Sequence, residues 1–216
     1  MPEELEMVDV LIAQYVAGSL PEPARVLVES HLEMRPESMS FVSDLEGLAG
    51  AALELAEPAA VTSRDRSLEA IFASAPPSMP DVFTLPSRSD SGFPKALREY
   101  VGTDRKTVPW KTLLPGLKEH VIFRRNGAEA TLLWARAGRA LPNHTHEGLE
   151  LTLVLEGAFH DHRGRFVPGD ISVADESLDH RPVADDDAPC LCLSVLFAPL
   201  KYTGSRTRFI GDLIGF

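Results

Sequence analysis

A run of metal-ligating residue types bounded by two glycines constrains this chain more than any other feature. It reads Gly138, five residues, His144-x-His146, three residues, Glu150, six residues and Gly157. On an extended strand the side chains of His144 and His146 leave the same face, because strand side chains alternate with a period of two. The turn at Glu147-Gly148 folds the next strand back and aims the Glu150 carboxylate at the same point. The run therefore predicts a metal site on a pair of adjacent β-strands.

A fourth ligand is expected downstream of this run. The candidate is His180, which stands ten residues past the turn Pro168-Gly169-Asp170. Imidazole and carboxylate together suit Zn²⁺, Fe²⁺, Mn²⁺, Ni²⁺ or Cu²⁺. Three histidines and one glutamate can fill the tetrahedral shell of zinc, whereas an octahedral shell of iron, manganese or nickel keeps two positions open for chemistry. The residues alone do not choose between these metals.

This layout resembles the cupin superfamily. Its first motif, G-x5-H-x-H-x3-E-x6-G, matches at every position. Its second motif matches in the Pro168-Gly169-Asp170 turn and in His180, but residues 176–179 (ESLD) stand where the superfamily usually has Pro-x-Gly. The strand-like segments after Val108 are separated by Gly, Pro and Asp turns, which is typical of an antiparallel barrel or sandwich. The resemblance implies a jelly-roll barrel with His144, His146, Glu150 and His180 as the metal ligands.

The chain before the barrel carries apolar residues at helical spacing. Amphipathic helices are expected over residues 4–17, 24–34, 36–55 and 64–73. From Ala75 to Pro94 the composition changes to Pro, Ser and Asp, which indicates a linker. We therefore expect an α+β, multi-domain chain: a small helical bundle over residues 1–74, a linker over 75–95 and a cupin antiparallel β-barrel over 96–216.

Composition and charge argue against several classes of function. The net charge is −11 and no Lys/Arg-rich run occurs, whereas direct nucleic-acid binding relies on neutralising phosphates. The first ten residues, MPEELEMVDV, have neither the basic nor the apolar region of a signal peptide. No apolar run reaches the roughly 18 residues of a membrane helix. The two cysteines, Cys190 and Cys192, are too close on one strand for an unstrained disulfide. We expect a cytoplasmic protein with no membrane contact.

From end to end the chain resembles the ChrR-type anti-sigma factors, in which a helical, zinc-binding anti-sigma domain is joined to a cupin domain. The likeness rests on residues 15–20 (YVAGSL), 29–32 (ESHL) and 148–155 (GLELTLVL). The resemblance implies that the helical domain binds an extracytoplasmic-function (ECF, group IV) sigma factor. It also implies that the cupin is a sensing module, associated in that family with the response to singlet oxygen, and it favours zinc as the cupin metal.

The helical zinc motif of that family, H-x3-C-x2-C with an earlier His, is degenerate here. His31 stands, but Arg35 and Ser38 occupy the two Cys positions, and Glu6 occupies the early His position. Because arginine cannot ligate zinc and serine is a poor ligand, we expect no zinc in the helical domain. We hypothesise that an ion pair between Glu6 and Arg35 replaces it, with His31 an ordinary helix histidine.

The sigma-binding surface is expected on apolar helical stripes that are wider than a four-helix cluster needs. The candidates are Leu11, Ile12, Tyr15, Leu45, Leu48 and Leu53, for each of which a place in the core is the alternative. His160 and His162 are expected to face solvent at a hairpin end, and the two cysteines to pack in the core.

Two other classes of function stay open. The chain can be a cupin metalloenzyme, a dioxygenase or an isomerase, or a metal-stabilised module without chemistry; an enzyme is the less favoured interpretation. Cupin barrels often pair through their sheets, so the oligomeric state stays open, with a homodimer through the barrel as one possibility.

Overall fold

A computed structural model describes residues 2–60, 62–75, 92–125 and 127–203, with side chains from residue 7 onward. The chain divides into two compact units, one of residues 1–46 and 91–216 and the other of residues 47–90. The domain boundaries expected at residues 74 and 95 stay a prediction. Residues 76–91, most of the expected linker, lie outside the described part.

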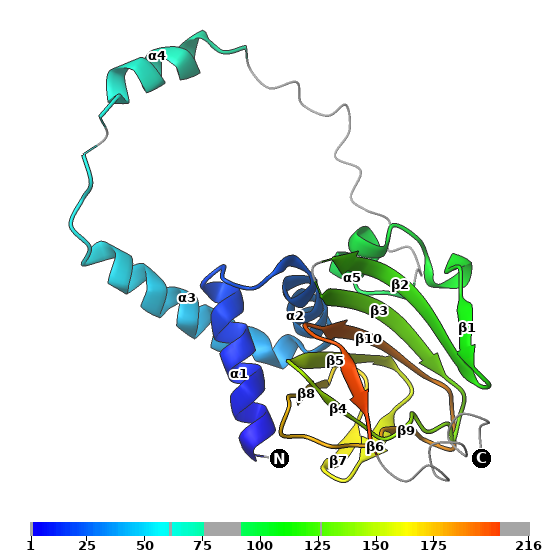
Figure 1. The fold of residues 1–216 in the computed structure, drawn as a ribbon. Coiled ribbons are helices and arrows are strands. Elements are labelled where there is room, and N and C mark those ends of the chain that lie inside the picture. Colours follow the sequence, from blue (N-terminus) through cyan, green and yellow to red (C-terminus); the bar gives the residue numbers. More distant parts are fainter. Residues whose placement is uncertain (1, 61, 76–91, 126, 204–216) are drawn as a thin grey trace. The chain divides into compact units, whose positions relative to one another are not determined.

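The larger unit contains an antiparallel six-stranded sheet (Figure 1). Its strands, in spatial order, are β1 (Lys111–Leu114), β2 (Leu117–Arg125), β3 (Ala128–Ala135), β10 (Cys190–Leu196), β5 (Glu150–Glu156) and β8 (Ile171–Ala174). The unit also contains two smaller antiparallel sheets: β4 (His144–His146) with β11 (Leu200–Tyr202), and β7 (Gly164–Phe166) with β6 (Phe159–Asp161) and β9 (Val183–Ala184). The expected cupin fold is confirmed.

Both faces of the large sheet are buried, and the sequence alternates between them. On β5, Leu151 and Leu153 belong to one apolar core, whereas Val154 belongs to a second core on the opposite face. On β10, Leu191 and Leu193 join the first core and Cys190 joins the second. A strand covered on both sides becomes an almost continuous apolar run, which is why residues 190–196 read CLCLSVL.

Helices cover the first of these faces (Figure 1). Helix α1 (Pro2–Val16) contacts β8, and α2 (Glu22–Met34) contacts β5, β10 and a short helix, α5 (Lys95–Val101). Leu27 and Val28 of α2 are fully buried in the core that includes the leucines of β5 and β10. Burying each such side chain stabilises the fold by about 1.5–3 kcal/mol. Residues 7–34 are therefore held mainly by apolar packing on the β-sheet.

Helix α3 (Met39–Glu54) follows a 3₁₀ turn, η1 (Pro36–Ser38). In the larger unit, Val42 is buried and Leu45 packs against the same core. The smaller unit contains the end of α3 and helix α4 (Arg64–Ala73). Its large apolar side chains are exposed: Leu48, Leu53, Leu55, Ile71 and Phe72. A second 3₁₀ turn, η2 (Arg105–Thr107), precedes β1. In the described part of the chain, no helix is long and apolar enough to cross a membrane.

Candidate metal centre

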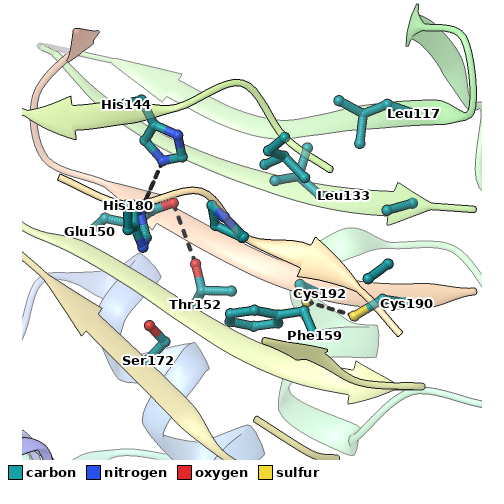
Figure 2. A pocket seen from close by; sticks show the side chains of 14 residues that line it. Leu117, Leu133, His144, Glu150, Thr152, Phe159, Ser172, His180, Cys190 and Cys192 are labelled. Carbon is teal, nitrogen blue, oxygen red and sulfur yellow. Dashed lines mark hydrogen bonds and ion pairs between the residues drawn. The ribbon is translucent and has the colours of Figure 1, made fainter. Parts of the chain in front are cut away.

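The structure brings the four predicted ligands together inside the barrel. His144 and His146 lie on β4, Glu150 begins β5, and His180 forms a backbone bridge with His144. One donor atom from each residue lies within 4.8 Å of the others, and all four residues are buried. Strands β4 and β5 are not hydrogen-bonded neighbours, because they belong to different sheets. The site is therefore closed by side chains that reach toward one another across the barrel (Figure 2).

The glycine that closes the first motif has a steric reason. Gly157 has φ +67°, and a Cβ there would lie 2.2 Å from the carbonyl oxygen of Pro189. No other residue fits this turn without moving the backbone that leads into β10. The Gly157 turn therefore packs against the start of β10, the strand that pairs with β5.

Hydrogen bonds orient each imidazole in the same way. Nδ1 of His144 lies 2.8 Å from the carbonyl oxygen of Pro142, and Nδ1 of His146 lies 3.2 Å from that of Asp175. Nδ1 of His180 lies 3.0 Å from Oδ2 of Asp161. Because each of these oxygens can only accept, each Nδ1 carries the proton and each Nε2 presents a lone pair. The three lone pairs point toward one another and toward Glu150.

Glu150 completes this arrangement as a carboxylate. Its Oε2 lies 2.6 Å from Nε2 of His146 and 3.8 Å from Nε2 of both His144 and His180. Its Oε1 accepts a hydrogen bond from Ser194 Oγ at 3.1 Å, which leaves Oε2 for the centre. Burial alone would raise the pKa of Glu150, but the three imidazoles around the carboxylate outweigh burial and hold that pKa well below its usual value.

This donor set fits a metal ion. Neighbouring donors around an ion at about 2.1 Å are roughly 3.0–3.4 Å apart, whether the shell is octahedral or tetrahedral. The separations of 2.6, 3.0 and 3.8 Å between the donor atoms bracket that range. A buried cluster of bare imidazole nitrogens around a carboxylate needs a cation to be favourable. The four residues can therefore hold a metal ion in the cupin domain.

A small cavity of about 50 Å³ adjoins His144, Glu150 and His180 (Figure 2). Most of its lining is apolar and includes Phe159, Cys190 and Cys192. The two thiols are buried with their Sγ atoms 3.5 Å apart, so the expected core packing is confirmed. The hydrogen bond with Cys190, followed by burial, raises the pKa of the Cys192 thiol well above its usual value.

One residue near the centre was not identified from the sequence. Asp161 contacts His180, and its side chain is only 1% exposed. It lies two residues after Phe159 on β6, so both side chains point inward by strand alternation. Strand alternation was therefore the sequence feature that could have identified Asp161 as an inward-facing residue. It also places His160 and His162 outward, and both are exposed as expected.

The residues at the degenerate zinc positions join α2 to the barrel instead. Nδ1 of His31 donates to the carbonyl oxygen of Gly169 at 2.6 Å, and Ser38 Oγ lies 3.3 Å from its Nε2. Arg35 Nη2 donates to Asp170 Oδ1 at 2.8 Å. We call the side chains of His31, Arg35 and Ser38 with the Gly169-Asp170 turn the α2 clasp. A guanidinium with a carboxylate partner beside His31 does not fit a zinc ion.

Two expectations about the helices change with this geometry. His31 is buried and hydrogen-bonded to the barrel, so it is more than an ordinary helix histidine. The hypothetical Glu6–Arg35 pair stays untested because the Glu6 side chain lies outside the described part. Of the candidate sigma-contacting residues, Leu11 and Ile12 are buried in the core, Tyr15 and Leu45 pack against it, and Leu48 and Leu53 are exposed.

Comparisons with known proteins point to the same combination of domains. Residues 98–198 match the family model described as "ChrR Cupin-like domain". The chain is 36% identical over 205 residues to the "Anti-sigma-E factor ChrR" of Cereibacter sphaeroides, a match that covers 94% of this chain and 93% of that protein. It is also similar to the crystal structure of Rhodobacter sphaeroides SigE in complex with the anti-sigma ChrR. That match has a TM-score of 0.73 and 36% identity and covers 87% of this chain and 96% of that one.

Proposed function

This chain belongs to the ChrR family of anti-sigma factors, and on that premise we propose that it binds an ECF (group IV) sigma factor and inhibits transcription by it. The observation that carries the proposal is the likeness over nearly the whole chain, helices included, to a protein crystallised with its sigma factor. A cupin acting alone would need no such helices. Binding a cytosolic transcription factor also favours a cytoplasmic location.

We assign the sigma-contacting surface to the exposed apolar residues of α3 and the segment after it. Leu48 and Leu53 are 70% and 76% exposed, and Leu55 is 89% exposed. Exposed leucines on a helix are typical of a face that docks into a partner's apolar groove. Leu11 and Ile12 are already used in the core, so they contribute by holding α1 on the barrel.

The experiment is co-purification of the full-length chain with each ECF sigma factor of its host, followed by transcription in vitro. We expect one sigma factor to bind and to lose activity. The double variant Leu48→Asp/Leu53→Asp should bind at least about tenfold more weakly, since it removes two docked leucines. Leu113→Asp, at an exposed leucine on β1, is the matched control. Failure of the wild-type chain to bind any of these sigma factors would refute the proposal.

We further propose that His144, His146, Glu150 and His180 hold zinc, as the family implies, and that the cupin acts as the sensing module. Such an ion would supply a Lewis-acidic centre whose shell these four residues can fill. Elemental analysis of the purified protein tests this assignment against iron, manganese and nickel. The oligomeric state stays open, and light scattering of the pure protein can check whether the chain forms a homodimer through the barrel.

The helical region, in contrast, is proposed to function without zinc. Its former ligand positions are engaged in the α2 clasp, and its apolar face is buried on the sheet. An enzymatic role stays the alternative, because a second cavity of about 200 Å³ also adjoins His144 and Glu150 and exceeds the roughly 150 Å³ that admits benzene.

A further inference from the structure

Among the described hydrogen bonds of the metal centre, Asp161 is the only carboxylate that accepts from the Nδ1 of a ligand histidine. His144 and His146 donate from Nδ1 to the backbone carbonyls of Pro142 and Asp175. His180 donates to a carboxylate, at 3.0 Å. A carboxylate behind a ligand histidine fixes the ring orientation and increases the basicity of the opposite nitrogen. His180 is therefore set apart from the other two imidazoles.

Arg163 fixes the Asp161 carboxylate in place. Its guanidinium donates to Asp161 Oδ2 from Nη2 at 2.7 Å and from Nε at 3.1 Å, and its backbone N–H donates to Oδ1 at 2.8 Å. Burial alone would raise the pKa of Asp161, but hydrogen bonds from His180 and Arg163 outweigh it and hold that pKa far below its usual value. The buried carboxylate is thus ionised and paired.

Arg163 is itself anchored to the large sheet. It donates to the carbonyl oxygen of Val173 and to Ser172 Oγ, each at 2.8 Å, and both residues lie on β8. The side chain is 14% exposed. Any movement of the β6–β7 hairpin that displaced Asp161 and Arg163 would break the hydrogen bonds between Arg163 and β8. Strand β8 pairs with β5, which carries Glu150.

We propose that Asp161, held by Arg163, is the positioning residue of the metal centre: it fixes His180 with Nε2 toward the ion and increases the donor strength of that nitrogen. The inference rests on the proposed metal site. It predicts a loss of metal affinity when Asp161 changes, although Asp161 touches no ion itself.

The same sheet offers a matched control. Asp185 also pairs with a histidine and an arginine, His160 at 3.2 Å and Arg165 at 2.6 Å. His160 and Arg165 are exposed, and neither is a ligand. Asp185→Asn therefore removes a carboxylate with similar partners and leaves the metal centre alone.

The test measures Zn²⁺ affinity of the full-length chain by competition with a chromophoric chelator. Asp161→Ala should weaken binding by about 10–100-fold, the usual effect of losing such a partner. Asp161→Asn keeps an acceptor oxygen but not the charge, so its loss should be smaller, and Asp185→Asn should bind as the wild type does. Thermal unfolding of the metal-free proteins shows whether a variant has merely lost its fold.

A second readout separates positioning from general stability. In the wild-type protein, nitrogen NMR of the zinc form should show His180 protonated at Nδ1, and the visible spectrum of the Co²⁺ form should change in Asp161→Asn but not in Asp185→Asn. Equal zinc affinities and equal Co²⁺ spectra for the wild type and Asp161→Asn would overturn the inference and leave the metal site intact. Absence of zinc binding by the wild type would instead overturn the metal site itself.

Discussion

Nε2 of His144 lies 3.0 Å from Nε2 of His180, and the proton of each ring is engaged on the opposite nitrogen. Two lone pairs at this distance repel unless a cation lies between them or one ring takes up a second proton. The same two residues form a backbone bridge, with an N–H···O distance of 3.0 Å in each direction. The fold therefore imposes a contact that is unfavourable without positive charge.

Removal of the metal should lower the stability of the barrel for this reason. A ligand present at about 100 times its dissociation constant stabilises the native state by about 2.7 kcal/mol. We expect dialysis against a strong chelator to lower the midpoint of thermal unfolding by several degrees, and added Zn²⁺ to restore it. An unchanged midpoint after complete metal removal would contradict a structural contribution of the ion.

His146→Ala should abolish metal binding, because it removes the ligand closest to Glu150, at 2.6 Å. We expect the metal content to fall from about one ion per chain to less than about a tenth, as three remaining donors no longer close the shell. The measurement is elemental analysis after gel filtration. His160→Ala, at an exposed histidine of the same barrel, should retain the full content.

Gly157→Ala should be strongly destabilising, by about 2–4 kcal/mol, because a positive φ and a steric clash act together. A Cβ at Gly157 would lie 2.2 Å from the Pro189 carbonyl oxygen, whereas one at Gly127, with φ +83°, would meet nothing within 4 Å. Gly127→Ala is therefore the control for backbone strain alone, which costs about 1 kcal/mol. Chemical denaturation of both variants gives the comparison, and equal losses would show that the clash is relieved.

The metal ligands and most elements could be predicted from local sequence because their signals are local. The predicted helix over 64–73 matches α4, and β2 lies among the strand-like segments predicted after Val108. Helix α5 was missed because its seven residues follow a Pro/Ser-rich stretch and depend on Leu97, which is fully buried in the core that includes α2. Asp161 and the α2 clasp were missed because their partners are distant in sequence.

The division between helices and barrel shows a further limit of sequence reasoning. A heptad-like apolar stripe gives the buried face of a helix but not what covers it. The sequence predicts Leu27 and Val28 in a helical bundle, yet they share a core with Leu151 and Leu193 of the sheet. The helix-facing leucines of β5 and β10 alternate with the residues that line the metal site, so one short sequence serves both surfaces.

The α2 clasp should make stability depend on pH through His31. Burial lowers the pKa of His31 from 6.5; Arg35 lowers it further, and the Gly169 carbonyl, Asp170 and Glu37 oppose the shift without cancelling it. The unfolded chain then binds a proton more readily than the folded one. The stability that neutral His31 contributes is complete above about pH 6.5 and is lost as the pH falls through that value toward the folded pKa, by at most about 1.4 kcal/mol per pH unit.

The measurement is the difference in unfolding free energy between the wild-type protein and His31→Gln at pH 7.5 and at pH 5.5. Glutamine does not titrate, so acid effects on the metal ligands cancel in this difference. We expect the wild type to lose more stability than His31→Gln on acidification, because only the wild type must protonate a buried ring or keep it neutral at a cost. A difference that is independent of pH would mean that His31 stays accessible to solvent protons and that α2 does not remain clasped to the Gly169-Asp170 turn.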